Sequence, residues 1–397
     1  MELEQQNILF FARTMEVGGT EQIVLQLCRI FQDKVNKIVV CSCGGSYTAR
    51  LEEMHIRHYT LPDITKRTPG MIYKTYIALK KIIEDEEITV VHTHHRMAAF
   101  YARILQRRYH YIHIVTVHNI FENRRLLTRM AYKGANIIAC GNAVKDNLKQ
   151  FFDVPENGIH VICNSVEENK MTDEGDGKTV DYGTDKALKD SIADMTDAEI
   201  HELKDDIYEK MRKWRKKGYF LVGNIARLEK QKGIEYFIRS FPIAGKCCNK
   251  LKYIIIGDGS EREALESLAM QMGGAASEND IIFLGRRDDV GNFMVCMDLI
   301  VLSSLWEGYP LVPIEAFAAG KTIVASDIAG IKEIVTNQKN GVLVPPADAA
   351  ALAKGITRLL TDQDKRKQLE ENAYHTYCEE YSYAAFVRQT LDYYCGL

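Results

Sequence analysis

Apolar residues along this chain gather in short runs that alternate with longer amphipathic stretches. The runs of the first half are "NILFFA", "KIVVCSC", "ITVVHTH", "YIHIVTVH" and "NIIACG", and those of the second half are "YFLVGNIA", "LKYIIIGDG", "DIIFLG", "MDLIVLSS" and "KTIVAS". Short apolar runs separated by helical segments indicate parallel strands with helices packed on both faces. The pattern therefore predicts an α/β fold with two doubly wound sheets.

A polar segment separates the two halves. It contains "ENKMTDEGDGKTVDYGTDKALKD", which is rich in Gly and Asp and lacks an apolar period, followed by one predicted helix. We expect an N-terminal domain over 1–167, a charged insert with a helix over 168–217 and a C-terminal domain over 218–380. Residues 381–397 form a last amphipathic segment.

Composition narrows the class of protein. The 397 residues are 46% hydrophobic, which suits two domains with separate cores, and the formal net charge of −3 gives no bulk attraction to nucleic acid. The first residues lack the basic and apolar regions of a leader, and no apolar stretch reaches the length of a membrane span. The ten cysteines are scattered, which favours reduced thiols. We therefore expect a cytoplasmic protein.

Two carboxylates bracket a tight turn in the segment "LWEGYPLVPIEAFAAG". Glu307 follows an apolar strand, and Glu315 lies in an otherwise apolar helix after the Gly-Tyr-Pro turn. A single buried acid is commonly one half of a structural ion pair, and that alternative stays open for each residue. Two acids around one turn predict a polar ligand that lies across the start of the helix.

Other strand-to-helix loops carry candidate contacts for an anion. Arg227 and Lys232 follow the first strand of the second half, where they are placed to share a phosphate, although a solvated basic loop is the alternative. Gly18 and Gly19 precede Thr20, a predicted N-cap. These glycines allow a phosphate to approach the backbone, or they serve only the φ angles of a turn. Their spacing is neither a dinucleotide fingerprint nor a P-loop.

Histidines gather at two strand ends. His92, His94 and His95 lie in "VVHTHHRM", and His118 ends "VTVH". Neighbouring histidines can bind a metal, but no carboxylate or cysteine stands beside the first three at ligand spacing. We therefore predict no metal site. A histidine at the end of a strand is otherwise commonly structural.

Several of these segments occur together in one known family. The segment around Glu307 and Glu315 resembles the donor-binding segment of GT-B retaining glycosyltransferases of family 4, the group 1 type, with its Glu-x7-Glu motif. The segments "GGTE", "ARLEKQKG", "IIGDG", "FLGRRDDV" and "GVLVPPADAAALA" also occur in the family's usual order. The resemblance covers most of the chain and is weakest over about 165–217.

The resemblance implies a GT-B fold, in which two Rossmann-like domains face each other across a cleft. It also implies transfer of a sugar from a nucleotide-sugar donor with retention of configuration. In this family pattern Glu315 binds the ribose, Glu307 binds the sugar, and Arg227 and Lys232 neutralise the diphosphate. The implied catalytic residues are His118, Glu307, Arg227 and Lys232. The implied donor-binding residues are Gly18, Gly19, Arg227, Lys232, Glu307, Gly308, Tyr309, Leu311, Val312 and Glu315.

Many metal-dependent transferases hold a cation on the diphosphate with an Asp-x-Asp motif. In the C-terminal region this spacing occurs at Asp362 and Asp364, which we interpret as caps at the start of a helix. Arg227 and Lys232 are placed to supply the positive charge instead. We expect a metal-independent hexosyltransferase with no cofactor and with a UDP-sugar as its donor.

The family pattern further implies a glycan or lipid-linked acceptor, in the assembly of a surface polysaccharide or glycoconjugate. His92, His94 and His95 are the candidates for the acceptor side. The basic segments "EKMRKWRKKG" and "ENRRLLTRMAYKG" suggest peripheral contact with the inner face of a membrane. The final helix is expected to cross back to the N-terminal domain. The alternatives are an epimerase or phosphorylase of the same fold, and a non-catalytic subunit that partners another transferase.

Overall fold

The computed structural model describes residues 1–16, 18–66, 68–121, 123–166, 206–272, 280–287 and 289–397. The chain forms two compact units. Unit 1 contains Met1–Ser165 together with Tyr383–Leu397, and unit 2 contains Val166–Ser382. Most of the predicted insert, 168–217, lies outside the described residues, which resume at 206.

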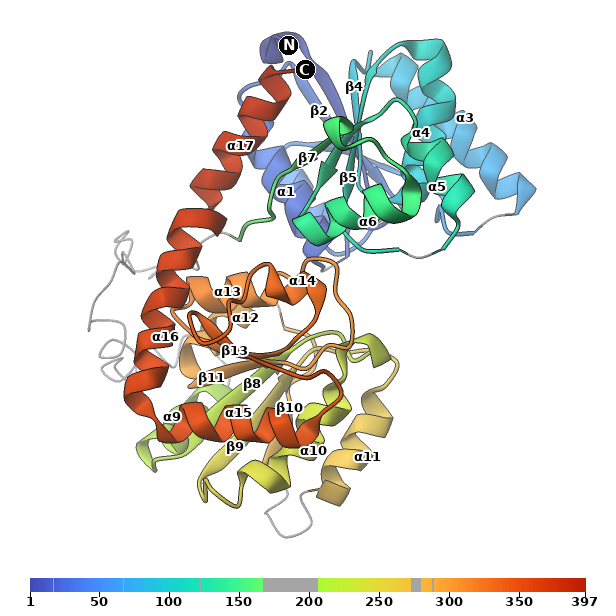
Figure 1. Ribbon diagram of the computed structural model, residues 1–397. Helices are drawn as coiled ribbons and strands as arrows, with labels where there is room; N and C mark the ends of the chain where they lie inside the picture. Colours follow the sequence, from blue (N-terminus) through green and yellow to red (C-terminus); the bar gives the residue numbers. More distant parts are fainter. Residues whose placement is uncertain (17, 67, 122, 167–205, 273–279, 288) are drawn as a thin grey trace. The chain divides into compact units, whose positions relative to one another are not determined.

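Unit 1 is built on a parallel sheet (Figure 1). Its described strands are β1 (Asn7–Phe11), β2 (Lys37–Ser42), β3 (Arg57–Thr60), β4 (Val90–Thr93), β5 (Ile112–Val117), β6 (Asn136–Ala139) and β7 (Ile159–Val161). Their order in the sheet is β3-β2-β1-β4-β5-β6-β7. The chain therefore winds from β1 to one edge and restarts beside β1 with β4. In this register Phe10 lies opposite both Val40 and His92.

Helices cover both faces of this sheet. They are α1 (Gly19–Phe31), α2 (Thr48–Glu53), α3 (Pro69–Asp85), α4 (Arg96–Tyr109), α5 (Arg125–Tyr132), α6 (Asn142–Phe152) and α17 (Tyr383–Cys395). Successive side chains of a strand point to opposite faces, so a strand buried on both sides is apolar throughout. In β1, Phe10 packs in the cluster that contains α1 and α17, whereas Leu9 packs in the cluster that contains α3 and α4.

Unit 2 repeats this architecture. Its described strands are β8 (Phe220–Ile225), β9 (Leu251–Ile256), β10 (Ile281–Phe283), β11 (Leu299–Leu302), β12 (Ile323–Ser326) and β13 (Gly341–Val344). They are parallel and lie in the order β10-β9-β8-β11-β12-β13. The switch in winding therefore falls between β8 and β11.

The helices of unit 2 pack on this second sheet. They are α9 (Asp206–Lys216), α10 (Ile234–Ala244), α11 (Arg262–Met272), α12 (Val290–Cys296), α13 (Val312–Ala318), α14 (Ala329–Lys332), α15 (Ala349–Thr361) and α16 (Gln363–Thr376), with a π-helical turn at Tyr377–Tyr381. One core cluster joins Val222 and Val301 of the sheet to Phe237 of α10 and Ile356 of α15. No helix within the described residues is both long and apolar enough to cross a membrane.

The predicted fold class is confirmed, because both units are doubly wound parallel α/β sheets. Each predicted apolar run contains a strand, whereas β3, β7 and β13 were not predicted. The strand β3 lies at an edge, has no buried residue and lacks an apolar run. The prediction of Thr20 as an N-cap is wrong. The helix α1 begins at Gly19, and Gly18 occupies the cap position.

Candidate functional site

The loops that follow β8 and β11 lie together at one edge of the sheet in unit 2. Ligands of doubly wound sheets bind at this kind of switch point, beyond the carboxyl ends of the strands. Hydrogen bonds that involve the backbone join the loops: Leu305 N donates to Gln231 O over 2.8 Å, and Ser303 Oγ donates to Lys232 O over 3.1 Å. The loops that carry the predicted cations and the first predicted acid therefore form one surface.

Two glycines allow this close packing. Gly233, which follows the first loop, has a φ of 56°, and a β-carbon there would overlap the carbonyl oxygen of Ser303. Gly330 of α14 lies against the carbonyl groups of Glu307 and Gly308, where a β-carbon would again overlap them. A side chain at either position would push the backbones apart.

Glu307 and Lys232 form an ion pair at this surface. The Lys232 ammonium lies 2.5 Å from Glu307 Oε1, and the two side chains are only 16% and 7% exposed. Ser304 Oγ donates to the same oxygen over 2.7 Å. Removal of either charge would leave its partner buried without compensation, which is costly. Glu307 therefore does form the structural ion pair that was the alternative interpretation, and its contact with a ligand stays a prediction.

Gln231 and Ser304 belong to this site but were not singled out from the sequence. Gln231 Nε2 donates to Trp306 O over 2.8 Å and lies 3.4 Å from Glu307 Oε2. The available signals were the polar pair of serines that ends the run "VLSS" and the glutamine between two lysines in "EKQKG". Neither signal identifies a partner, because these contacts join loops that are distant in sequence.

Arg227 stands apart from this ion pair. Its side chain is exposed and makes no hydrogen bond or ion pair with any residue that the structure describes. The backbone N–H groups of Gly308 and Leu311 likewise have no acceptor in the described part of the chain. Tyr309 between them is buried, and Val312 begins α13. One guanidinium and two amide donors are therefore available to an anion.

Glu315 lies in the first turn of α13 and is half-buried. Burial raises the pKa of its carboxyl to about 7. No hydrogen bond or ion pair joins its side chain to another described residue. A carboxyl group with this pKa is only partly ionised at neutral pH, and hydroxyl donors from a ligand would favour its ionised form.

The corresponding switch point of unit 1 lies between β1 and β4. The loop after β1 carries Gly18 and Gly19, and Gly18 is extended with a φ of −174°, so no left-handed turn requires a glycine there. A β-carbon on Gly18 would lie 2.6 Å from Glu21 Oε2, and the other carboxylate oxygen of Glu21 accepts the Thr14 hydroxyl over 2.6 Å. This carboxylate reduces the attraction of α1 for a phosphate. The donor contact at these glycines stays a prediction.

The ends of β4 and β5 bring three of the predicted histidines together. His94 Nδ1 lies 3.0 Å from His118 Nε2, and the rings of His92 and His94 are 4.3 Å apart. His92 is hydrogen-bonded through Nδ1 to Tyr394 Oη over 2.6 Å and through Nε2 to Thr116 Oγ1 over 2.7 Å. Tyr394 comes from α17, at the other end of the sequence, and could not be paired with His92 from local pattern.

These three histidines are neutral at pH 7. Burial lowers the pKa of His118 to about 4 and holds the pKa values of His92 and His94 well below the usual 6.5. His94 Nε2 has no partner among the described residues. An orphaned buried N–H is rarer than an orphaned acceptor, so we assign the His94 proton to Nδ1, which donates to His118. His118 then presents a neutral Nδ1–H donor rather than a charged acid.

His95 is separate from this group. Its Nδ1 accepts a hydrogen bond from Met97 N over 3.1 Å, so the side chain caps α4. Burial lowers the pKa of His95 to about 4. His95 therefore has a structural role as the cap of α4, and its role on the acceptor side stays a prediction.

The described residues contain no group of three His, Cys, Asp or Glu side chains that is arranged to hold a metal ion. Asp362 Oδ1 accepts a hydrogen bond from Lys365 N over 2.9 Å at the start of α16. The predicted capping role of Asp362 is thereby confirmed, and Asp364 lies in the first turn of the same helix.

Comparisons with known proteins agree with this architecture. The sequence profile of the family "Glycosyl transferases group 1" matches residues 206–376, and that of "Glycosyltransferase Family 4" matches residues 17–170. The chain is 28% identical over 265 residues to an uncharacterized glycosyltransferase of Methanocaldococcus jannaschii, an alignment that covers 66% of this chain and 60% of that protein.

A second relative aligns over more of its length. The chain is 25% identical over 367 residues to the Escherichia coli UDP-Gal:alpha-D-GlcNAc-diphosphoundecaprenol alpha-1,3-galactosyltransferase, covering 87% of this chain and 86% of that enzyme. Among solved structures, Anabaena HepE in complex with UDP-glucose superimposes with a TM-score of 0.79 at 20% identity, covering 99% of this chain and 100% of that one. The chain therefore belongs to the group 1, family 4 glycosyltransferases and has the GT-B fold.

Proposed function

We propose that this protein transfers a sugar from a UDP-sugar, with retention of configuration, to a glycan or lipid-linked acceptor. The observation that carries the proposal is the surface at the β8–β11 switch point of unit 2. There Arg227, the Lys232–Glu307 pair and Glu315 surround a turn with free backbone donors. The UDP-glucose bound by the structural relative and the lipid-diphosphate acceptor named for the E. coli relative support the substrate classes.

The proposed roles in donor binding follow from charge and hydrogen-bonding capacity. Arg227 and the N–H groups of Gly308 and Leu311 bind the diphosphate, which needs donors and positive charge. Glu315 accepts the ribose hydroxyls. Glu307 accepts sugar hydroxyls while it positions Lys232, and the ammonium contacts the diphosphate from its place in the pair.

Retention is proposed to arise by displacement on one face of the sugar. The bond between the anomeric carbon and the diphosphate oxygen breaks, and the leaving UDP takes the electron pair. The acceptor hydroxyl then bonds to the same face and gives its proton to the departing phosphate oxygen. Glu307 already holds Lys232 and Ser304, which makes it a poor nucleophile for a double displacement. Fixed cations that face the leaving group stabilise its developing charge.

The direct test is an assay of purified protein with UDP-sugars and a short-chain prenyl diphosphate-linked sugar. We expect release of UDP, a product with the donor's anomeric configuration by NMR, and activity within about twofold after EDTA, since Arg227 and Lys232 supply the charge. Arg227→Ala should lower kcat/KM about 10- to 150-fold, whereas Lys230→Ala, an exposed lysine in the same loop, should change it little.

Several outcomes would contradict this function. Interconversion of donor sugars without an acceptor would indicate an epimerase, and dependence on inorganic phosphate would indicate a phosphorylase. Neither transfer nor hydrolysis with any UDP-sugar, in folded protein that binds no UDP, would favour a non-catalytic subunit. Complete loss of activity with EDTA, restored by manganese or magnesium, would return a metal to the mechanism.

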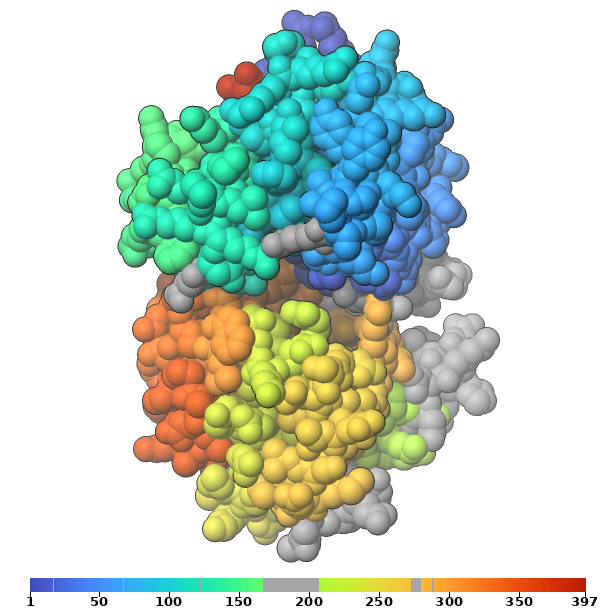
Figure 2. Space-filling view, turned by 90° about the vertical axis from the view of Figure 1, so that its right-hand side faces the viewer, coloured from blue at the N-terminus to red at the C-terminus, as the bar shows by residue number. Residues whose placement is uncertain are grey.

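Peripheral membrane contact is proposed for one side of unit 1. Large apolar residues are exposed on α3 and α5, where Tyr73 is 66% and Leu126 is 75% exposed, beside the exposed cations Lys74 and Arg124. Figure 2 looks onto this side of unit 1, in blue to teal. Apolar side chains among cations suit an anionic bilayer surface. This contact would place the protein at the inner face of the membrane, in the cytoplasm.

The basic segment of α9 is less suited to such contact. Trp214 is half-buried, and the Lys252 ammonium lies 5.2 Å from the centre of its ring. Arg215 pairs with Asp298. Since no large apolar side chain is exposed on the described residues of α9, we assign the membrane contact to α3 and α5.

A further inference from the structure

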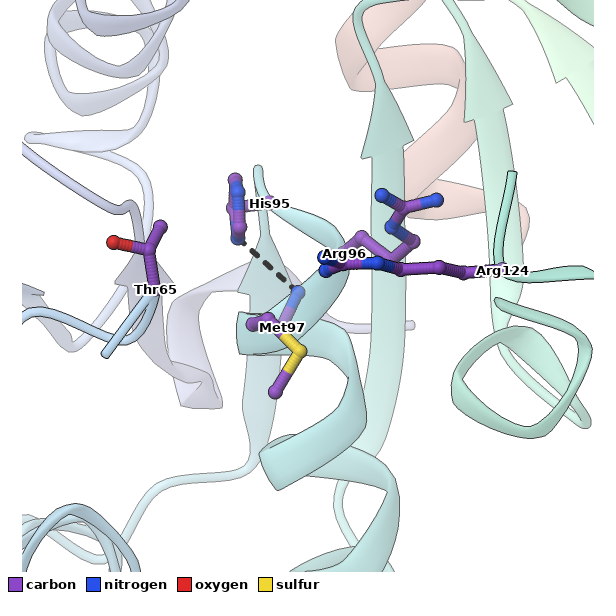
Figure 3. Close-up of a pocket in the computed structure, with 5 residues that line it drawn as sticks. All are labelled: Thr65, His95, Arg96, Met97 and Arg124. Carbon is purple, nitrogen blue, oxygen red and sulfur yellow. Dashed lines mark hydrogen bonds between the residues drawn. The ribbon is translucent and has the colours of Figure 1, made fainter. Parts of the chain in front are cut away.

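A pocket of about 410 Å³ opens in unit 1 beside the amino end of α4 (Figure 3). It is lined by Thr65, His95, Arg96, Met97 and Arg124. In Figure 3 Thr65 and His95 lie on one side and the two arginines on the other. This volume falls in the range of small-molecule sites. The sequence predictions assigned neither arginine to a ligand site.

Arg96 is held in place by α5 and the loop before it. Its Nη1 donates to Asn123 Oδ1 over 3.1 Å and to Thr128 Oγ1 over 3.3 Å, and its guanidinium carbon lies 4.6 Å from the centre of the Phe121 ring. These contacts use one end of the guanidinium and leave Nε and Nη2 as donors. A fixed, planar fork of this kind loses little freedom when it binds an anion.

Arg124 differs from the arginines that follow it. Arg125 and Arg129 both pair with Asp153, at 2.6 and 3.0 Å. In the described part of the chain no carboxylate pairs with Arg124 or Arg96, and the Arg124 side chain has no hydrogen-bond partner there. The pocket therefore carries two positive charges that the described residues do not neutralise.

The opposite wall of the pocket adds a donor. Because His95 Nδ1 accepts the Met97 N–H and the ring is neutral, its proton lies on Nε2, which becomes a donor. The nearest acid to Thr65 is Asp63, which accepts the Thr65 hydroxyl over 2.8 Å and lies 3.6 Å from Arg13 Nε. Because Arg13 lies beside Asp63 and offsets its negative charge, this side of the pocket does not repel an anion.

We propose that this pocket binds the phosphate or diphosphate group that joins the acceptor sugar to its carrier. The inference rests on the proposed function and names the acceptor's chemical class. Two guanidinium groups and an imidazole N–H match the several oxygens and the charge of such a group. The pocket also adjoins the starts of α3 and α5, whose exposed apolar residues would meet a lipid carrier. A lipid diphosphate and a soluble sugar phosphate share this chemistry.

The test is calorimetric titration of the full-length protein with inorganic pyrophosphate, in the presence of saturating UDP so that the donor surface is filled. We expect one further site. Arg124→Gln should raise its Kd about 10- to 150-fold, because a charge-assisted hydrogen bond is lost. Arg125→Gln, which removes a neighbouring arginine outside the pocket, should leave the Kd within about twofold. Circular dichroism would verify that both variants are folded.

A second titration distinguishes the two sources of the phosphate. Tighter binding of geranyl diphosphate than of pyrophosphate would support a lipid-linked acceptor, and tighter binding of glucose 1-phosphate would support a soluble one. Both effects should be lost in Arg124→Gln. Equal pyrophosphate binding by wild type and Arg124→Gln, or no binding beside UDP, would overturn the proposal.

The outcomes separate this inference from the proposed function. Suppose that the protein binds UDP and releases UDP from a UDP-sugar, but pyrophosphate does not bind at a second site. The pocket assignment is then wrong, and the donor-site assignment is unaffected. If UDP does not bind the wild-type protein, the proposed function fails, and pyrophosphate titrated alone still reports on the pocket through Arg124→Gln.

Discussion

Glu307 and Lys232 illustrate how one residue pair can serve both the fold and a ligand. Their charges meet at 2.5 Å with little exposure, and Ser304 shares the carboxylate. In the absence of donor the pair neutralises itself, which limits the cost of burying two charges. A diphosphate that arrives beside Lys232 would share the ammonium with Glu307. The Glu307 carboxylate could then also accept the sugar hydroxyls.

Unfolding of single and double variants tests this coupling. Lys232→Ala and Glu307→Ala should each lower the free energy of unfolding of unit 2 by about 1–3 kcal/mol, because each leaves a buried group unsatisfied. The loss in the double variant should be smaller than the sum by about 0.5–3 kcal/mol. Urea unfolding followed by tryptophan fluorescence is the measurement, since both tryptophans, Trp214 and Trp306, belong to unit 2. Strict additivity would show that the two charges do not interact.

Glu315 should make nucleotide affinity depend on pH. Its pKa is raised to about 7 in the free protein, and hydroxyl donors favour the carboxylate, so the pKa in the complex is lower. Binding then releases a proton below pH 7. Affinity should therefore rise with pH up to about 7 and level off above it, falling by up to about tenfold per unit on the acid side.

Calorimetric titration with UDP between pH 5.5 and 8.5 would measure this dependence, and Glu315→Gln is the matched control. The variant keeps the shape of the side chain but cannot titrate, so it retains only the slope that comes from the diphosphate itself. If UDP affinity depends on pH equally in the wild type and in Glu315→Gln, Glu315 does not bind the ribose.

Residue identity was more predictable than residue pairing. The Glu-x7-Glu spacing and the two cations of "ARLEKQKG" single out Arg227, Lys232, Glu307 and Glu315 from the sequence alone. That Lys232 pairs with Glu307 while Arg227 makes no ion pair with a described residue depends on how two loops meet. Sequence spacing carries no information on that approach, because it is set by the order of strands in the sheet.

Among the strands, too, the hydrophobic pattern predicts some and misses others. Strands buried on both faces, such as β1 and β9, are continuous apolar runs and are predictable. The edge strand β3 reads Arg-His-Tyr-Thr and forms because β2 offers backbone partners, which no local pattern reveals. The apolar residues exposed on α3 and α5 were also not separable from core residues by period alone.

Those exposed residues lead to a prediction about membrane binding. Substituting Tyr73 and Leu126 by Ser should weaken binding to vesicles that contain phosphatidylglycerol by more than about tenfold, since a buried apolar side chain contributes about 1.5–3 kcal/mol. The matched control is Met270→Ser on α11 of unit 2, where the side chain is 79% exposed against 75% for Leu126. Flotation of vesicles is the measurement. An equal loss in the control, or none in the double variant, would contradict the assignment to α3 and α5.

At the scale of the whole molecule, the chain passes between the two units twice. It leaves unit 1 after Ser165 and returns to it at Tyr383. The helix α17 therefore completes a unit whose other residues come from the beginning of the chain. Tyr394 is fully buried, lies 4.4 Å from the Phe31 ring and binds His92, and the amino group of Met1 donates to Cys395 O over 2.6 Å. The last helix is therefore part of the core of unit 1.

Removal of α17 should destabilise unit 1 far more than unit 2. Truncation after Ser382 deletes the buried rings of Phe386 and Tyr394, each of which contributes about 3–5 kcal/mol when lost from a core. Such losses are comparable to the whole stability of a domain. We expect the truncated protein to lose the unfolding transition of unit 1 in circular dichroism, while the unfolding transition of unit 2, followed by tryptophan fluorescence, keeps its midpoint. A truncated protein that keeps both transitions would show instead that unit 1 folds without its last helix.

A milder variant separates stability from activity. Tyr394→Phe keeps the ring but removes the hydroxyl partner of His92 Nδ1, and it should cost about 1–3 kcal/mol as a buried polar group loses its bond. Because the His92 ring packs against the tilted ring of His94, which in turn is hydrogen-bonded to His118, the loss should also lower transfer per folded molecule, whereas UDP affinity on unit 2 should not change. If transfer per folded molecule equals that of the wild type, the link from α17 to the histidines serves stability alone.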